Sequence, residues 1–166
     1  MQADTNRIRL LQSMPLFGGV DDEIMNYLLS RARVVNRPGG AYYFRESDPG
    51  DAMYVLEAGR VAIVKSWQDK EFVLRELNCG DSFGEMAVID LFPRSAGVMA
   101  MEDCEALELS SEMLFEVYER DTRQFALMQM NVAREISRRL RVADERLFEL
   151  RMSEKALPLK YDSHIY

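Results

Sequence analysis

Glu85 and Arg94 stand nine residues apart in the mostly apolar stretch FGEMAVIDLFPRSAGV (residues 83–98). Gly84 would let the backbone approach a ligand closely, and a short helical turn after it would present free amides, which favour an anion. The fixed charge of the Arg94 guanidinium suits phosphate oxygens. Glu85 would accept a hydrogen bond from a hydroxyl beside the phosphate. These residue types therefore indicate a site for a sugar phosphate that keeps a free hydroxyl.

Small residues lie beside the two charged ones. Ala87, Ser95 and Ala96 would keep space open there, and they would supply further amides and one hydroxyl. A Gly-Glu dipeptide followed by an arginine also occurs in proteins as a simple surface ion pair. Taken alone, the stretch leaves both interpretations open.

The rest of the composition lacks the side chains of the common catalytic sites. The 166 residues are 48% hydrophobic, enough for one domain with a core. The only histidine is His164, so a cupin-type metal site and a serine or cysteine nucleophile with a histidine base both lack their histidine. No GxSxG, GxxxxGK[ST] or GxGxxG pattern occurs. We therefore expect no enzyme activity, no metal and no resident cofactor.

The net charge and the two cysteines argue against nucleic-acid binding and against a metal site. A net charge of −7 opposes strong binding to nucleic acid. The arginines around Arg139 are interleaved with acidic residues, which favours a solvated helix with intrahelical ion pairs over a nucleic-acid surface. Cys79 and Cys104 have no second thiol or histidine at metal-binding spacing, and are predicted to be packed free thiols.

The sequence also predicts where the protein acts. No apolar run is long enough to cross a bilayer, and the N-terminus lacks the basic and then apolar layout of a signal peptide. We expect a soluble, cytoplasmic protein that makes no contact with a membrane.

Three zones follow one another along the chain. Residues 1–33 are predicted to be helical, because Asp4 or Thr5 can cap one helix and Asp21 begins the acidic first turn of another. Residues 34–110 are short β-branched and aromatic runs separated by turn residues, which predicts a β-sandwich or barrel.

Helices follow over residues 111–155. From Asp121 to about Lys155, apolar residues recur every three or four positions, which predicts one long amphipathic helix. So small a barrel cannot cover the whole apolar stripe, so we expect a homodimer in which residues 121–155 pack against the same helix of a second copy. The tail, residues 156–166, has no clear periodicity.

The opening stretch resembles the phosphate-binding cassette of the cyclic nucleotide-binding domain family, whose pattern is FGE[LM]AL…PR[AST]A. SMPLFGGVDDEIMNYLL is similar to the N-terminal helices of this family, FRESDPGDAMYVLEAGRVAIV to its first strands, and CGDSFGE to the segment that leads into the cassette. ISRRLRVADERLFEL resembles the long dimer helix of the bacterial catabolite activator proteins. The resemblance runs from about residue 12 to residue 150.

This resemblance implies a binding module with a mainly β fold and flanking helices. The expected fold is a jelly-roll β-barrel within a single domain, residues 1–155, with its cassette at residues 83–96. The barrel would hold a cyclic nucleoside monophosphate, cAMP or cGMP. The long helix after the barrel would close over the base.

The family's site residues can be placed on this sequence position by position. Gly84 begins the cassette, Glu85 would bind the ribose 2′-hydroxyl and Arg94 the cyclic phosphate. The phosphate cradle would be completed by the Ser95 hydroxyl and by the backbone amides of Met86, Ala87 and Ala96.

Three further residues are implied outside the cassette. Ile63 and Leu74 would line the base and sugar, and Arg139 would pair with Glu85, so that helix position depends on the occupied pocket. Ile63 and Leu74 are also compatible with ordinary barrel core, and Arg139 with a solvated helix arginine.

Two departures from the bacterial activators change the expected specificity and output. Ala143 and Asp144 stand where those proteins carry a threonine and a serine that read adenine. Asp144 could accept hydrogen bonds from two N–H groups of guanine, a hypothesis that favours cGMP; a solvated helix flank is the alternative. No helix-turn-helix follows the long helix, so we expect no binding to DNA.

The predicted function is a cyclic nucleotide receptor that passes ligand occupancy, through movement of its long helix, to an unidentified partner protein. The alternative is a degenerate cyclic nucleotide-binding fold that serves as a ligand-free interaction or dimerisation module. The positioned carboxylate and guanidinium argue against that alternative, because a scaffold has no need of them.

Overall fold

The computed structural model describes residues 5–68 and 70–153. They form two compact units, residues 1–132 and residues 133–166. The first unit contains the sheets, and the second contains most of the last helix. The predicted tail, residues 156–166, lies outside the described residues. The predicted single domain, residues 1–155, stays a prediction.

The chain begins with helices, as predicted. These are α1 (Thr5–Gln12), the short 3₁₀ helix η1 (Pro15–Phe17) and α2 (Asp22–Arg31). Asp21 caps α2, because its side chain accepts a hydrogen bond from the backbone amide of Ile24 at 2.9 Å. Of the two caps predicted for the first helix, Asp4 or Thr5, Asp4 lies outside the described residues.

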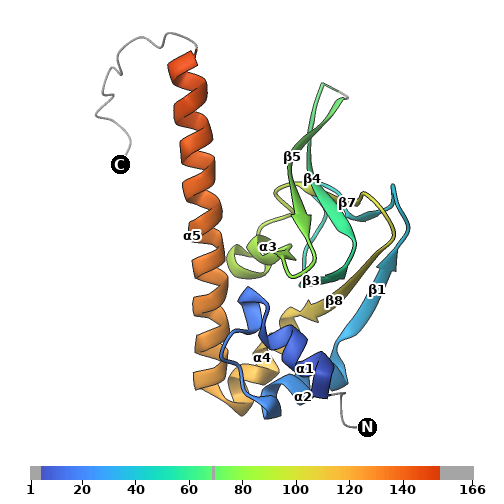
Figure 1. Ribbon diagram of the computed structural model, residues 1–166, viewed down its shortest axis with the longest axis vertical. Helices are drawn as coiled ribbons and strands as arrows, with labels where there is room; N and C mark the ends of the chain where they lie inside the picture. Colours follow the sequence, from blue (N-terminus) through green and yellow to red (C-terminus); the bar gives the residue numbers. More distant parts are fainter. Residues whose placement is uncertain (1–4, 69, 154–166) are drawn as a thin grey trace. The chain divides into compact units, whose positions relative to one another are not determined.

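Eight strands follow and form two antiparallel sheets of four strands. The first sheet has the order β1-β8-β3-β6 and the second the order β2-β7-β4-β5. This arrangement confirms the predicted jelly-roll fold (Figure 1). The strands are β1 (Arg33–Arg37), β2 (Tyr42–Phe44), β3 (Ala52–Ala58), β4 (Arg60–Trp67), β5 (Lys70–Asn78), β6 (Ser82–Phe83), β7 (Gly97–Ala100) and β8 (Cys104–Ser110).

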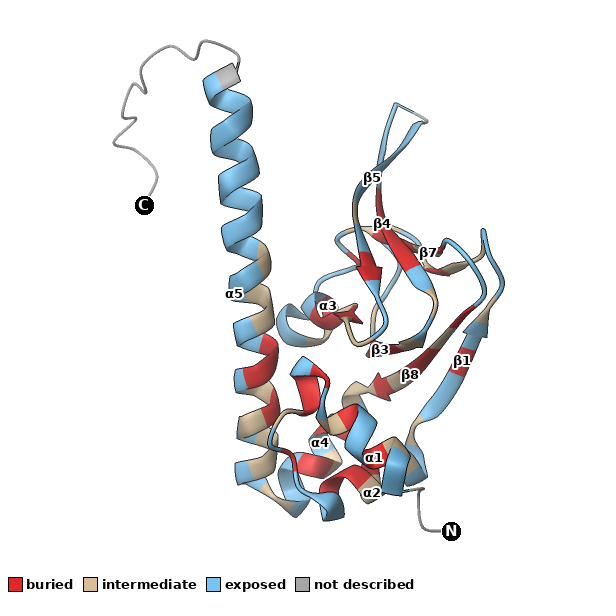
Figure 2. Ribbon diagram, viewed as in Figure 1, coloured by how far each residue is buried: buried red, intermediate tan, exposed pale blue. Residues whose placement is uncertain are grey.

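Aromatic side chains fill the space between the sheets. The Phe83 ring stacks on Tyr54 with their centroids 5.2 Å apart, and it meets Tyr43 edge to face at 5.0 Å. Val61 and Leu56 are fully buried in the same cluster. Figure 2 shows buried segments along β3, β4 and β8. Burial of each such side chain contributes roughly 1.5–3 kcal/mol. Because Phe83 ends β6, the core fixes the point at which the cassette begins.

The last three helices are α3 (Glu85–Asp90), α4 (Ser111–Arg120) and α5 (Thr122–Ser153). The predicted long helix is confirmed within one or two residues at each end. Asp121 is extended, with φ −149° and ψ 96°, and separates α4 from α5. Its carboxylate accepts hydrogen bonds from the amides of Arg123 and Gln124 at 2.9 and 3.1 Å, so it caps α5.

The two thiols differ in their surroundings. Both are free, and Cys104 is buried at the start of β8. Cys79 is exposed, so the prediction that it packs in the interior is wrong. It lies just after β5, in the turn that leads to β6. Within the described part of the chain, no helix is both long and apolar enough to span a bilayer.

Asn131 ties the first turns of α5 to the N-terminal segment. It is buried, and its amide donates to the carbonyls of Leu16 and Gly18 at 3.0 and 2.9 Å. Met128 and Val132 on the same helix are also buried. This part of α5 is therefore an integral element of the first unit.

Replacement of Asn131 by alanine should destabilise the protein. The carbonyls of Leu16 and Gly18 would lose their buried donor, so we expect the free energy of unfolding to fall by about 2 kcal/mol. Urea denaturation followed by circular dichroism measures this. Arg123→Ala, at an exposed position of the same helix, should stay within about 0.5 kcal/mol of the parent protein. Equal stability of Asn131→Ala and Arg123→Ala would contradict the anchoring role.

Candidate functional site

The cassette begins with a glycine that no other residue can replace without strain. Gly84 has φ +79°, and a Cβ there would lie 2.7 Å from Nη1 of Arg94 and 3.3 Å from the carbonyl oxygen of Ala52. The left-handed conformation and the close approach both require glycine. Helix α3 starts immediately afterwards at Glu85.

A sharp reversal at the end of α3 brings the chain back to Arg94. Leu91 adopts φ +58°, and the amide of Phe92 donates to the side chain of Asp90 at 3.0 Å. A non-glycine residue in this conformation costs about 1–3 kcal/mol. The surrounding structure must therefore hold the turn in place.

The turn between β2 and β3 holds the backbone of Arg94 on both sides. The Arg94 amide donates to the carbonyl of Asp48 at 2.8 Å, and the Ser47 amide donates to the carbonyl of Arg94 at 2.9 Å. Asp48 also accepts a hydrogen bond from the amide of Arg45 at 2.7 Å, which shapes the turn. Sequence analysis predicted turn residues between the strands of residues 34–110 but did not place this turn at the site.

The side chain of Arg94 is buried, with 5% of its surface exposed. Its Nη1 donates to the carbonyl of Gly84 at 2.8 Å, and its Cζ lies 4.0 Å from the centre of the Phe44 ring. Its Nε is buried and has no hydrogen-bond partner among the described residues. A Cβ on Gly50 would lie 2.6 Å from that nitrogen, so Gly50 also keeps the space free.

Burial lowers the pKa of the Arg94 guanidinium from its ordinary value. Tyr54, Asp51 and other acidic groups nearby raise the pKa and oppose this effect. Because arginine remains charged at neutral pH, the site holds a buried positive charge with an N–H donor to spare. Such a group is costly unless an anion or acceptor meets it. The arrangement therefore suits an anionic ligand.

The other cassette residues lie around this charge. Glu85 is buried, 4% exposed, at the first position of α3, where the helix dipole favours a carboxylate. Glu85 is also among the charges that raise the pKa of Arg94, so the two predicted groups are close. Ala87 is buried, whereas Ser95 is exposed and donates to Sδ of Met86 at 3.5 Å.

Ile63 and Leu74 lie on neighbouring strands in different environments. Ile63, on β4, belongs to the core cluster, as one of the two interpretations predicted. Leu74, on β5, is 51% exposed, so its interpretation as barrel core is wrong. The register passes from Ile63↔Arg75 to Val64↔Val73 and leaves Leu74 as an extra residue. Leu74 therefore lies at a β-bulge.

Arg139 and Asp144 lie on α5 in the second unit. Arg139 donates from Nε to Glu135 at 2.8 Å, and Arg138 forms an ion pair with the same carboxylate at 2.8 Å. The predicted intrahelical ion pairs are confirmed for these two arginines. Asp144 is exposed. The pairing of Arg139 with Glu85 and a base contact by Asp144 stay predictions.

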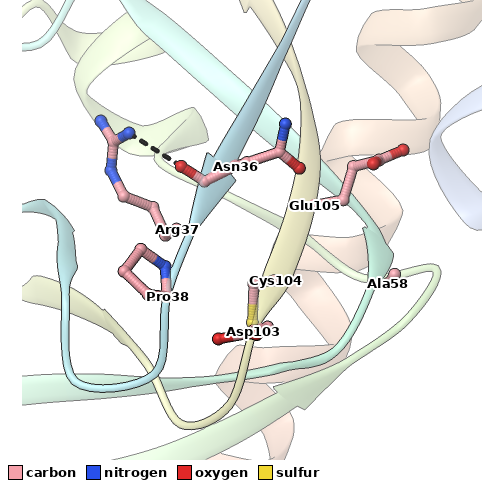
Figure 3. Close-up of a pocket in the computed structure, with 7 residues that line it drawn as sticks. All are labelled: Asn36, Arg37, Pro38, Ala58, Asp103, Cys104 and Glu105. Atoms are coloured by element: carbon pink, nitrogen blue, oxygen red, sulfur yellow. Dashed lines mark hydrogen bonds between the residues drawn. The ribbon is translucent and has the colours of Figure 1, made fainter.

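Hollows in the first unit differ in how close they lie to the cassette. One of about 380 Å³ adjoins the cassette between the β2–β3 turn and the end of α3, and is lined by Pro49, Gly50, Asp51, Leu91, Phe92 and Pro93. Another, of about 440 Å³, contains no cassette residue (Figure 3). In Figure 3 the side chains of Arg37 and Glu105 extend in opposite directions, so they do not converge on one ligand.

Among the residues that the structure describes, no three His, Cys, Asp or Glu side chains gather in a way that could hold a metal ion. The site is therefore characterised by its buried arginine and by the amides at the start of α3.

Comparison with known proteins gives a consistent result. The sequence model of the cyclic nucleotide-binding domain matches residues 34–121. The cyclic AMP receptor protein of Thermus thermophilus is 33% identical over 145 residues, which are 87% of this chain and 65% of that protein. The chain thus spans slightly less than two thirds of the length of this relative.

Solved structures share the fold. A cyclic nucleotide-binding domain from Methylobacillus flagellatus KT has a TM-score of 0.77 over 92% of this chain and 84% of that chain, at 23% identity. The regulatory domain of Toxoplasma gondii PKA, crystallised with cAMP, has a TM-score of 0.66 at 25% identity. That likeness covers 79% of this chain and 48% of the Toxoplasma chain.

Replacement of Gly50 by alanine should disturb Arg94 directly. The new methyl group would lie 2.6 Å from Nε of Arg94 and 2.7 Å from Cβ of Ala87. We expect the free energy of unfolding to fall by about 1–3 kcal/mol. In an Arg94→Ala background one of the two clashes is gone, so the same change should cost about 1 kcal/mol less.

Urea denaturation of the two single variants and the double variant measures this coupling. Gly18→Ala is the matched control, because a Cβ at Gly18 would meet nothing closer than 3.7 Å and the residue has φ −55°. Additive effects of Gly50→Ala and Arg94→Ala would show that Gly50 does not crowd the guanidinium.

Proposed function

This chain belongs to the cyclic nucleotide-binding domain family, and we propose that it is a receptor for a cyclic nucleoside monophosphate, cAMP or cGMP. The observation that carries this proposal is Arg94, a buried guanidinium with an unpartnered Nε beside the start of α3. A cyclic phosphate would supply the acceptor and the negative charge that such a group needs.

The remaining cassette groups complete the ligand site in this proposal. The amides of Met86 and Ala87 donate to the phosphate, because the first amides of a helix have no partner within the helix. The hydroxyl of Ser95 and the amide of Ala96 donate to it from the segment before β7. Glu85 accepts a hydrogen bond from the ribose 2′-hydroxyl. Ile63 packs against the base and sugar from the barrel side, and Leu74 reaches them from the β5 bulge.

Relatives support the class of ligand. The Thermus protein is named a cyclic AMP receptor protein, and the Toxoplasma regulatory domain was crystallised with cAMP. The base that this chain prefers depends on Asp144, whose carboxylate matches the paired N–H groups of guanine better than the N1 acceptor of adenine. We therefore propose cGMP as the preferred ligand of the two.

Occupancy would be transmitted through α5. A ligand that binds one position of the helix more tightly shifts the population toward that position. Arg139 is the proposed sensor, because its pairing with Glu85 would link the helix to the ribose site. The receiver would be a partner protein in the cytoplasm, and the chain itself would carry out no catalysis.

A second copy of the chain is the proposed partner for α5 itself. Beyond the first unit this helix exposes large apolar side chains at intervals of three or four residues, including Leu140, Leu147 and Leu150. The same helix from a second copy would cover this stripe in a homodimer. A ligand-free dimerisation module would use the same stripe, but it would leave the buried charge of Arg94 without a purpose.

Arg94→Ala should weaken the binding of cAMP and of cGMP by at least about a hundredfold, because the charge that faces the phosphate is lost. The cassette should remain folded, since Arg94 is held partly by its own backbone hydrogen bonds. Isothermal titration of nucleotide-stripped protein measures both affinities, and circular dichroism checks the fold.

Arg123→Ala, an exposed arginine outside the site, should bind as tightly as the parent protein. An Arg94→Ala variant that binds with unchanged affinity would sink the proposed site. Absence of binding by the folded parent protein would favour the ligand-free module instead.

Glu85→Ala should remove the preference for the ribose hydroxyl. In the parent protein we expect 2′-deoxy-cAMP to bind about tenfold more weakly than cAMP, because the buried carboxylate is left without its hydroxyl donor. In Glu85→Ala the two ligands should bind equally. Competition titration gives both ratios.

Glu112→Ala is the matched control, since Glu112 also lies in an acidic first turn, that of α4, and is exposed. This variant should keep the preference of the parent protein. A preference that survives in Glu85→Ala would assign the ribose hydroxyl to another residue.

A further inference from the structure

Within the cassette, the side chain of Met86, which can be oxidised, contacts the hydroxyl of Ser95, which is proposed to bind the ligand. Met86 is the second residue of α3 and is 47% exposed. Its Sδ accepts a hydrogen bond from the hydroxyl of Ser95 at 3.5 Å. A thioether is a weak acceptor, so this hydroxyl can exchange the sulfur for a phosphate oxygen at little cost.

We propose that Met86 is a site of reversible oxidation, and that its sulfoxide weakens the binding of cyclic nucleotides by holding the hydroxyl of Ser95. This proposal rests on the proposed function, because it assigns a means of regulation to the same site. The side chain of Met86 acts through Ser95 and therefore has a positioning role, separate from that of the Met86 backbone amide, which is proposed to donate to the phosphate.

The chemistry needs a peroxide as oxidant. A lone pair of Sδ attacks one oxygen of hydrogen peroxide, and the O–O bond breaks as the S–O bond forms. The sulfur loses two electrons to the peroxide, and the departing hydroxide takes up a proton to become water. The products are methionine sulfoxide and one water molecule, and methionine sulfoxide reductases reverse the change.

Oxidation of Met86 would replace a weak hydrogen-bond acceptor beside Ser95 by a strong one. The sulfoxide oxygen is a strong acceptor, whereas the sulfur of Met86 is a weak one. The hydroxyl of Ser95 would then remain with the sulfoxide and would no longer donate to the phosphate. A hydrogen bond to a charged group is worth enough for its loss to weaken binding about tenfold or more.

The other exposed methionines provide the comparison. Met130 is 53% exposed on α5, so a peroxide should reach it as readily as Met86. It lies outside the cassette, so its oxidation should leave nucleotide affinity unchanged. Buried methionines such as Met25 and Met53 should resist mild treatment.

The experiment treats the full chain with dilute hydrogen peroxide and locates each added oxygen by peptide mass spectrometry. Isothermal titration with cAMP and with cGMP follows, before oxidation, after it, and after repair by methionine sulfoxide reductases. Each variant is judged by the ratio of its oxidised to its reduced Kd. The variants are Met86→Leu, Met130→Leu and Ser95→Ala.

The expected result is oxidation of Met86, a rise in Kd of about tenfold or more in the parent protein and in Met130→Leu, and recovery after repair. The ratio should be close to one in Met86→Leu, which has no sulfur at this position, and in Ser95→Ala, which has no hydroxyl to capture.

Three outcomes would overturn the proposal. They are a Met86 that resists peroxide while Met130 reacts, a fully oxidised Met86 with unchanged affinity, and a full effect that persists in Ser95→Ala. Failure of the reduced parent protein to bind either nucleotide would instead refute the proposed function, and with it this use of Met86. The reduced and oxidised titrations therefore separate the two failures.

Discussion

The cassette is organised around the burial of one positive charge. Arg94 lies inside the protein, yet its guanidinium must be placed to an accuracy of tenths of an ångström if it is to meet a ligand. Gly50 and Gly84 leave room for the side chain of Arg94, because a Cβ at either would come within 2.7 Å of it. Phe44 covers one face of the guanidinium at 4.0 Å. The burial of Arg94 thus restricts which residues can stand at positions 44, 50 and 84.

The aromatic core provides the rigidity for this placement. Phe44 contacts Tyr54 and Phe83 through ring pairs 6.0 and 6.2 Å apart, so the ring beneath Arg94 cannot move independently of the core. Burial raises the pKa of Tyr54 to about 12, and its hydroxyl donates to Glu108 at 3.0 Å. Tyr54 therefore stays neutral across the physiological range, and the core presents a constant electrostatic surface to the guanidinium.

Sequence patterns predicted the parts of this structure that depend on local chemistry. The alternating strands, the start of a helix at the acidic residues from Asp21 and the apolar period of α5 depend on neighbours along the chain, and each was predicted close to its observed place. The family pattern in residues 83–96 brought Glu85 and Arg94 together correctly.

The features that sequence analysis missed depend on contacts between distant segments. Gly50 lies 44 residues from Arg94, and its role is defined only by the space that the folded guanidinium occupies. Leu74 lies at a bulge, where the strand pairing departs from a regular register, and a period of two residues along the strand cannot reveal such a departure. The Arg94 amide donates to the backbone carbonyl of Asp48, and every residue has such a carbonyl, so the residue type at position 48 could not predict this hydrogen bond.

The turn that holds Arg94 also bonds to the first residue of α4. Asp51 follows Gly50, and its carbonyl accepts hydrogen bonds from the amide and the hydroxyl of Ser111 at 2.7 and 2.9 Å. α4 is tied in turn to α2, because Glu116 accepts hydrogen bonds from Tyr27 and Arg31.

Beyond α4, the start of α5 is bound to the N-terminal segment through Asn131. Each of these links involves the backbone or a charged group, and together they form a continuous series of hydrogen bonds from the Arg94 turn to the helices. Such a series gives a displacement of the turn a physical route to the helical end of the first unit. A receptor needs such a route, because binding at the cassette has to move the helices. The hydrogen bonds from Ser111 to the carbonyl of Asp51 are where a movement of the β-roll would reach α4.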